Sequence, residues 1–491
     1  MKKCLCFQAI CLGWLFLFVY TVHADTPTDY EQVKAQLGEH SLPLINLVVD
    51  LDKVSKPVYT QASMEVCDPM RRMAGKELVP FCCKVKYRGS SSLRYEKKSF
   101  TIKLIDSHGE ECDANLLGLR NDDTWVLDAM AIDRIRMRNR VNFDVWNDMS
   151  RVPYQTDFNR RNGTVGLFVE LFVNGQYHGL YCLTDKVNRK LLALKKTKVS
   201  EQGDSTIRGV LYKGVEWSLA TKLNGYESTD TWSHIWNGWE LAYPEELPCE
   251  TSYGPLVRFI DYCSKTTDQQ LVDGVSQRFH MDNLCDYMVF LLSQGVWDNL
   301  FKNAYLSVVN ISKSERILIT PWDLDCSLGG GWNGDYADIM TDQRLVRSAE
   351  LTRRLWEGNL AAFKSLVSDR WKALRESILS EEVLNARLDD YAQQFMASGA
   401  WEREYDKWNG NPVPLKRDLS EEVAYVKDWY HRNATYLRDY VFRGVESEIR
   451  DVLSDKNDKQ GRKTVYNMAG QRVSSSYKGL VIVDGRKQMR R

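Results

Sequence analysis

Short runs of alternating hydrophobic and polar positions dominate the first half of the chain. In residues 99–105, for example, apolar side chains alternate with threonine and lysine. Alternation with a period of two predicts half-buried β-strands. The expected strands span residues 42–53, 81–88, 99–105, 166–173, 177–184 and 209–212. The pair Asn174-Gly175 predicts a tight hairpin between two of these strands.

The second half of the chain follows a helical period. The expected helices and later strands span residues 133–150, 281–296, 304–309, 316–320 and 345–440, the last with a break near 408–412. In the first of these helices, Arg140 and Asp144 have the spacing of an i,i+4 ion pair. The pattern predicts an α+β protein with a β-rich first part and a helical second part.

Composition and charge narrow the class of protein. The chain has 491 residues, of which 43% are hydrophobic and 27% charged, as is typical of a folded protein of two or three domains or one large domain. Lys and Arg together number 66, as do Asp and Glu, so the formal net charge is zero. Without a basic block, no nucleic acid is expected as a partner.

The N-terminus has the pattern of an export signal. Lys2 and Lys3 precede an apolar run over residues 9–20, and Ala24 ends a small-residue cleavage pattern before Asp25. The run is too short for a membrane span and lacks a charged stop, so no transmembrane segment is expected after cleavage. We expect a periplasmic, cell-surface or secreted protein.

Three of the twelve cysteines lie in the expected signal. Cys182, Cys285 and Cys326 fall in apolar runs and are expected to be buried. The more favourable candidates for disulfide bonds in an oxidising compartment are Cys67, Cys82, Cys83 and Cys112.

Two groups of polar residues interrupt the apolar pattern of the second half. Asp298 and Asn303 are five positions apart, and Asp323 and Asp325 follow the expected strand of residues 316–320. Phosphoryl transfer needs one carboxylate to orient the acceptor hydroxyl, and an Asn and another carboxylate to hold metal ions. Two unpaired carboxylates on one face of an extended segment are costly without a cation. The spacing favours a metal-dependent phosphotransfer site, although each residue alone also fits a loop or a helix cap.

A polar turn in the first half complements this group. Arg88 is followed by Gly89-Ser90-Ser91-Ser92, whose backbone N–H groups and hydroxyls suit phosphate, although the same residues form ordinary β-turns. The strand after a phosphate-binding loop normally supplies a lysine, so Lys103 is the first candidate and Lys98 the alternative. The acidic partner of this lysine stays open among Asp133, Asp144 and Glu170.

These motifs, in this order, resemble those of the CotH family of spore-coat-type atypical protein kinases. The similarity spans roughly residues 42 to 440 and includes the polar turn with residues 97–103, the hairpin at Asn174-Gly175, and both acidic groups. Ser90 stands where the family usually has Asn, and Asp185 where it commonly has Glu. Residues 464–491 resemble the short sorting-type tails of exported proteins from Gram-negative bacteria.

The resemblance implies an atypical two-lobed protein-kinase-like fold that uses ATP and Mg²⁺ or Mn²⁺. Asp298 would be the catalytic residue, and the metal would be held by Asn303, Asp323 and Asp325. The nucleotide would be bound by Arg88, Gly89, Ser90, Ser91, Ser92, Lys98, Lys103 and Asp185.

The expected organisation has four segments. They are a signal peptide at 1–24, a kinase-like domain at 25–450 with a β-rich lobe over about 40–215 and a helical lobe over about 250–445, a linker at 451–463, and a short β tail at 464–491.

Three functions compete on this evidence. The first is an exported kinase that phosphorylates Ser or Thr of a secreted or surface protein. The second is a catalytically silent surface, structural or binding protein with the same fold. The third is a metal-dependent hydrolase built on the aspartates, which is disfavoured because no histidine is suitably placed as a base.

Overall fold

A computed structural model describes most of the chain. The described residues are 28–150, 152–153, 161–202, 205–245, 250–341, 343–445, 465–467, 479–483 and 486–490. The expected signal peptide and the expected linker lie outside them.

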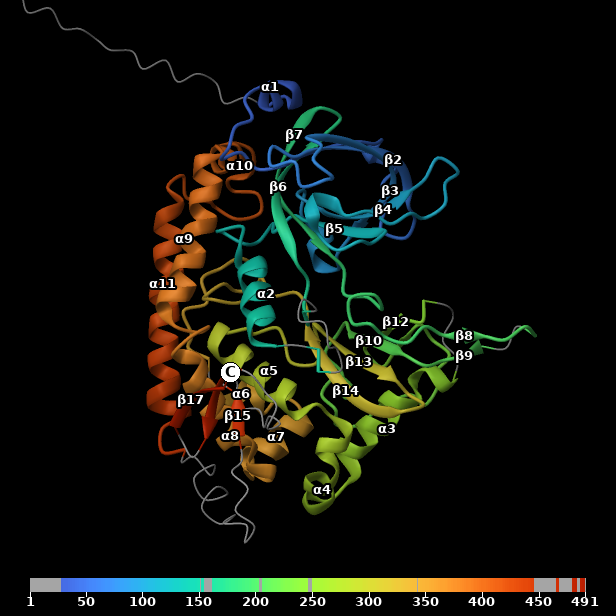
Figure 1. Cartoon of the computed structure of the whole chain (residues 1–491), viewed down its shortest axis with the longest axis vertical. Coiled ribbons are helices and arrows are strands. Elements are labelled where there is room, and N and C mark those ends of the chain that lie inside the picture. Colours follow the sequence, from blue (N-terminus) through green and yellow to red (C-terminus); the bar gives the residue numbers. More distant parts are fainter. Residues whose placement is uncertain are drawn as a thin grey trace, which may run out of the picture.

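Seven strands form a closed barrel in the order β1-β2-β3-β4-β5-β7-β6 (Figure 1). They are β1 (Leu44–Val48), β2 (Thr60–Cys67), β3 (Leu78–Arg88), β4 (Ser99–Ile105), β5 (Thr124–Asp128), β6 (Gly166–Val173) and β7 (Gln176–Asp185). Parallel pairing of β1 with β6 closes the barrel. The hairpin between β6 and β7 is confirmed, since Asn174 and Gly175 both have positive φ, at 52° and 80°.

The expected strand over residues 42–53 is interrupted after β1. The Asn174 side chain forms two hydrogen bonds with the backbone of Val49. It accepts the Val49 N–H at 3.0 Å and donates to the Val49 carbonyl at 2.9 Å. Asp50 then caps a short 3₁₀ helix, η1 (Leu51–Lys53). The hairpin turn therefore ends the strand that lies beside it.

A second sheet has the order β11-β12-β10-β13-β14. Its strands are β10 (Val210–Gly214), β11 (Ile235–Trp236), β12 (Trp239–Tyr243), β13 (Ala304–Asn310) and β14 (Ser314–Pro321), and a separate small pair is β8 (Lys198–Val199) with β9 (Ser205–Thr206). Because β10 pairs with β12 and β13, it belongs to this sheet and not to the barrel.

Helices make up most of the remaining chain. They are α1 (Tyr30–Ala35), α2 (Arg138–Met149), α3 (Glu250–Lys265), α4 (Asp268–Arg278), α5 (Met281–Gln294), α6 (Gln343–Val346), α7 (Glu350–Glu357), α8 (Phe363–Arg375), α9 (Glu381–Ala397), α10 (Ala400–Trp408) and α11 (Leu419–Tyr436). In Figure 1, α9 and α11 run side by side along one edge of the molecule, and α10 lies beside the barrel. Three further strands, β15 (Val465–Asn467), β16 (Gly479–Val483) and β17 (Arg486–Arg490), form a small sheet.

The helix expected over residues 133–150 begins later, at Arg138. Asp133 holds the preceding segment in a loop, because its carboxylate accepts the N–H groups of Ile135 and Arg138. The predicted pair between Arg140 and Asp144 is confirmed at 2.8 Å.

The two main hydrophobic cores are separate, and two smaller clusters accompany them. One main core fills the barrel, and the other joins the second sheet to the helices. The expected α+β class, with a sheet-rich first part and a helical second part, is confirmed, whereas the closure of the barrel is an addition that the strand pattern did not predict. Among the described helices, none combines the length and apolar character needed to cross a membrane.

The cysteines that the structure describes are all free thiols. Cys182, Cys285 and Cys326 are buried, as predicted. The expectation of disulfides among the other cysteines is wrong for this structure. Cys82 and Cys83 are neighbours on β3, so one side chain is exposed and the other points into the barrel core.

Candidate functional site

A cavity of about 840 Å³ lies between the outer face of the barrel and the second sheet. This volume is within the usual range for small-molecule sites. The predicted residues that line it are Arg88, Gly89, Ser90, Ser91, Ser92, Lys103, Asp298, Asn303, Asp323 and Asp325. Lys98 and Asp185 are not among the lining residues.

The register between β3 and β4 determines where Arg88 and Lys103 lie along the wall that the barrel contributes to the cavity. Arg88 pairs with Ser99, whereas Lys103 lies four residues further along β4. At about 3.3 Å per residue, this places Lys103 about 13 Å from the end that carries Arg88. The Arg88 guanidinium lies over the ring of Trp322, 5.0 Å from its centroid, beside Asp323. Arg88 is therefore at the carboxylate end, and Lys103 is at the far end, where it pairs with Glu111 at 2.5 Å.

The predicted polar turn lines the cavity beside Arg88. Gly89 has φ of +118°, and a Cβ there would lie 2.1 Å from Ser92 Oγ. Glycine is thus required by both backbone conformation and space. The turn continues as a 3₁₀ helix, η2 (Ser91–Arg94), and Arg94 donates to Asn333 Oδ1 at 3.2 Å.

Asp298 lies in the loop after α5 and carries donors on both carboxylate oxygens. Oδ2 receives the Asn303 side-chain N–H at 3.0 Å and forms a short ion pair with Lys302. Oδ1 receives the indole N–H of Trp217 at 3.4 Å. The predicted Asp298 and Asn303 are therefore in direct contact.

Asn299 joins the two acidic segments. Its buried side chain donates to the carbonyl of Asn303 at 2.8 Å and to that of Trp322 at 2.7 Å. Asn303 and Asp323 both have positive φ, at 54° and 59°, a conformation that Asn and Asp tolerate better than most residues. Such strain at two neighbouring polar residues is typical of a functional site. The sequence pattern did not single out Asn299.

Asp323 and Asp325 lack neutralising hydrogen bonds. Among the described residues, no donor is hydrogen-bonded to either carboxylate. Burial, together with repulsion from Asp323 and Asp128, raises the pKa of Asp325 well above its usual value. Asp323 is open to the cavity, but the surrounding protein still raises its pKa, with Lys213 opposing and Asp128 and Asp298 adding to the effect.

This donor set fits a hard divalent cation. The candidate ligands are carboxylate oxygens and the amide oxygen of Asn303, which Mg²⁺ and Mn²⁺ prefer over nitrogen or sulfur. A cation would also relieve the repulsion between Asp323 and Asp325. Asp128, at the end of β5, lines the same cavity and was not predicted from the sequence.

Lysines on the cavity walls complement the carboxylates. Burial and Arg88 lower the pKa of Lys213, which lies on β10 close to Asp323. Burial and the neighbouring Lys186 and Lys103 lower the pKa of Lys86. No ion pair joins Lys86, Lys186 or Lys213 to a carboxylate in the described part of the chain. The cavity thus offers unpaired cations for an anionic ligand and unpaired carboxylates for a metal.

Lys98 and Asp185 have structural partners instead. The Lys98 ammonium donates to the carbonyl of Tyr95 at 2.6 Å. Asp185 is buried, accepts the Val165 N–H at 2.8 Å and pairs with Arg120 at 3.1 Å.

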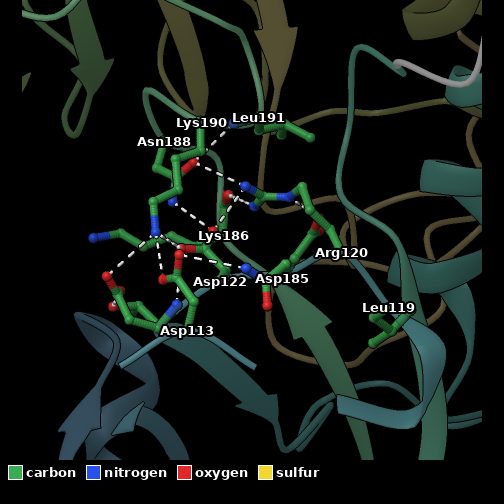
Figure 2. Close-up of polar contacts among 12 residues, drawn as sticks. Asp113, Leu119, Arg120, Asp122, Asp185, Lys186, Asn188, Lys190 and Leu191 are labelled. Atoms are coloured by element: carbon green, nitrogen blue, oxygen red, sulfur yellow. Dashed lines mark hydrogen bonds and ion pairs between the residues drawn. The ribbon is translucent and has the colours of Figure 1, made fainter. Parts of the chain in front are cut away.

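Figure 2 shows the network around Arg120 and Asp185. The Lys190 ammonium lies among three carboxylates, 2.6 Å from Asp113, 3.1 Å from Asp122 and 3.5 Å from Asp123. These carboxylates are close enough together to hold a metal ion, but the lysine already supplies the positive charge. The network ties the segment that leaves β7 to the loop between β4 and β5.

The acids left open as partners of a phosphate-binding lysine each pair with an arginine. The pairs are Asp133 with Arg138, Asp144 with Arg140, and Glu170 with Arg403. Among the described residues, the buried lysine that pairs with an acid is Lys97 and not one of the predicted lysines. Its ammonium lies 2.6 Å from Glu404 on α10.

Glu404 connects α10 to the wall of the cavity. Its fully buried carboxylate also receives Arg136 Nε at 2.7 Å and the backbone N–H of Leu180 at 2.7 Å. Arg136 in turn donates to the carbonyls of Met130 and Ala131, at 2.9 and 2.7 Å, and both of these residues line the cavity.

Comparison with known proteins agrees with this geometry. No curated protein matches the chain. The family model described as CotH kinase protein matches residues 85–437, which include the polar turn and both acidic groups. The match covers more than two thirds of the chain, and the protein therefore belongs to the CotH kinase family.

Proposed function

We propose that the protein is a metal-dependent protein kinase that transfers the γ-phosphate of ATP to Ser or Thr of another protein. One observation carries the proposal: Asp298, Asn303, Asp323 and Asp325 line one cavity with unpaired lysines opposite them. Family membership supports a kinase-related activity with nucleotide and divalent metal.

In this proposal the barrel and the helical part act as the two lobes of a kinase-like fold. The segment after β7, fastened by Arg120 and Lys190, acts as the connection between them. The triphosphate lies at the carboxylate end of the cavity, beneath the turn that begins at Gly89. Arg88 and Lys213 neutralise the phosphate oxygens, since both lie near enough to Asp323 to lower its pKa.

Asp323, Asp325 and Asn303 would hold Mg²⁺ or Mn²⁺, which supplies charge neutralisation for the transferring phosphoryl group when bound. Asn299 keeps the two segments that carry these ligands at a fixed separation. The ligand set is therefore preorganised by a single buried amide.

Asp298 would orient the acceptor hydroxyl and take its proton. The hydroxyl oxygen forms a bond to the γ-phosphorus while the bond from this phosphorus to the bridging oxygen of ADP breaks. Lys302 and Asn303 fix the carboxylate through Oδ2, which leaves Oδ1 for the acceptor. Neither Lys98 nor Asp185 has a role in this proposal.

We further propose that the acceptor is a secreted or cell-surface protein, on the basis of the expected export signal at residues 1–24. An ATP source outside the cytoplasm is then required.

Incubation of the mature protein with labelled ATP, Mg²⁺ or Mn²⁺ and a panel of exported proteins tests the proposal. We expect labelled acceptor or labelled enzyme. The absence of transfer, of autophosphorylation and of nucleotide binding with either metal would refute it. Release of free phosphate with no labelled acceptor would instead favour the hydrolase.

Thermal unfolding distinguishes the proposed kinase from a catalytically silent binding protein of the same fold. A ligand present at 100 times its Kd stabilises the folded state by about 2.7 kcal/mol. We expect ATP with metal to stabilise the wild type and not Asp323→Ala. A nucleotide shift that does not depend on metal would favour a binding protein.

A further inference from the structure

The two carboxylate oxygens of Asp298 differ in how firmly the chain holds them. Oδ2 has two donors from its own loop, Lys302 and Asn303. Within the described residues, Oδ1 has one donor, the indole N–H of Trp217, and the separation of 3.4 Å exceeds the usual range of about 2.7–3.2 Å. The oxygen that faces away from the loop is thus the weakly held one.

Trp217 comes from a different part of the chain. It follows Glu216, which lines the cavity, in the segment between β10 and β11, and its side chain is 41% exposed. The Lys302 ammonium lies 5.8 Å from the centroid of the indole ring. The ring therefore covers the pair formed by Asp298 and Lys302 at the edge of the cavity, without being buried itself.

We infer that Trp217 occupies the place of the acceptor hydroxyl at Asp298 Oδ1, and that a bound acceptor displaces its N–H. The inference rests on the proposed function, since the site has an acceptor only if the protein transfers phosphate. A hydroxyl donates to the same oxygen that the indole N–H now occupies, and a normal bond of about 2.7 Å replaces a long one. The ring that moves aside remains close enough to contact the acceptor.

This arrangement makes Trp217 a specificity-determining residue. A polypeptide acceptor can pack against the displaced ring, whereas water has no apolar surface with which to do so. Trp217 therefore suppresses hydrolysis of the nucleotide more than transfer to protein. A purely structural role is disfavoured, because the indole N–H has no other acceptor in the described part of the chain and Trp217 is 41% exposed.

The test compares Trp217→Phe with Trp232→Phe. The first variant keeps an aromatic ring and loses the N–H. The second changes another tryptophan of the same segment, which is 67% exposed and has no hydrogen bond to Asp298 in the described structure. The probes are water, measured as phosphate release from ATP with Mg²⁺ or Mn²⁺, and a peptide library with a central serine. Nucleotide affinity is measured in parallel.

For Trp217→Phe we expect phosphate release to rise by about three- to tenfold, the range for loss of one hydrogen bond. The KM for the peptide library falls by a smaller factor, because the smaller phenyl ring offers the acceptor less surface to pack against, and nucleotide affinity does not change. Trp232→Phe behaves as the wild type. Unchanged phosphate release and peptide KM in Trp217→Phe, or equal changes in both variants, would overturn the inference.

A second measurement, by NMR, does not require the protein to have enzymatic activity. The indole ¹⁵N–¹H signal of Trp217 is identified by its absence in Trp217→Phe, and we expect it to shift in Asp298→Ala. An unmoved signal would overturn the contact. If the wild type neither transfers nor releases phosphate, the proposed function fails, and this signal still decides whether Trp217 is bound to Asp298.

Discussion

Glu404 and Asp325 are both carboxylates inside the protein, but they have opposite surroundings. Glu404 is fully buried and receives donors from Lys97, Arg136 and the backbone. Asp325 lies at the cavity beside other aspartates, with no donor among the described residues. Despite the opposing effect of burial, Lys97 and Arg136 hold the pKa of Glu404 below its usual value, whereas burial and Asp323 raise that of Asp325.

The difference separates charges that hold the fold from charges that remain available for a ligand. A buried charge with partners is expensive to uncouple, because removal of one member leaves the others unpaired. A carboxylate without partners costs stability until a cation arrives. By this criterion the three aspartates around Lys190 belong with Glu404, since the lysine already neutralises them.

The largest expected effect is on catalysis, after substitution of an unpaired carboxylate in the cavity. Asp323→Asn removes one negative charge with little change in shape, and we expect phosphate transfer to fall by about 10²- to 10³-fold, as in other sites that lose charge stabilisation of the transition state. Labelled transfer from ATP measures this. Asp335→Asn, an exposed carboxylate outside the cavity lining, is the matched control and retains activity. Transfer within tenfold of the wild type in Asp323→Asn would contradict the assignment.

The next effect is on stability, after substitution of the paired carboxylate of Glu404. Glu404→Ala leaves Lys97 and Arg136 buried without their acid, and we expect the free energy of unfolding to fall by about 3–5 kcal/mol. Denaturant unfolding measures the loss. A decrease below about 1 kcal/mol would show that the network is not structural.

Asp325→Asn should act in the opposite direction on stability. Removal of a charge that burial and Asp323 disfavour raises the free energy of unfolding of the metal-free protein. Thermal unfolding in the presence of a chelator measures the gain, with Asp335→Asn unchanged. Destabilisation by Asp325→Asn would mean that this carboxylate has an unrecognised partner.

A further effect concerns the pH dependence of stability and Lys97. Burial lowers the pKa of Lys97 to about 7, although Glu404 opposes the shift. The unfolded chain, with an ordinary lysine pKa of about 10.4, then binds more protons than the folded chain between these values. Stability of the wild type therefore rises with pH from about 7 toward 10, by at most about 1.4 kcal/mol per pH unit.

Comparison of wild type with Lys97→Met at pH 7, 8 and 9 isolates this contribution. We expect the stability difference between them to change in favour of the wild type as pH rises. A parallel pH dependence in both proteins would mean that Lys97 keeps its proton throughout.

Local features were predictable from the sequence. The hairpin at Asn174 and Gly175 depends on two adjacent residues, and β4 matches the predicted range of residues 99–105 because its alternation is regular. The order of the acidic motifs led to the candidate site, and the structure brings Asp298, Asn303, Asp323 and Asp325 to one cavity.

The remaining features depend on contacts between distant segments. The barrel closes because residues 44–47 pair with 170–173, which no local pattern encodes. Lys213 reaches the site because β10 pairs with β13, and Glu404 lies more than 300 residues from Lys97 in sequence. The motif predicts a cofactor-binding role for Asp185, whereas the structure places it outside the cavity lining, with Arg120 as a partner.

Direct titration with Mn²⁺ in the presence of a non-hydrolysable ATP analogue, followed by electron paramagnetic resonance, is the most direct test of the central claim. We expect the wild type to bind Mn²⁺ with the nucleotide, Asp323→Ala to lose this binding, and Asp122→Asn at the Lys190 network to retain it. Equal Mn²⁺ binding by wild type and Asp323→Ala, or no binding by either, would contradict the claim that the unpaired carboxylates form the metal site.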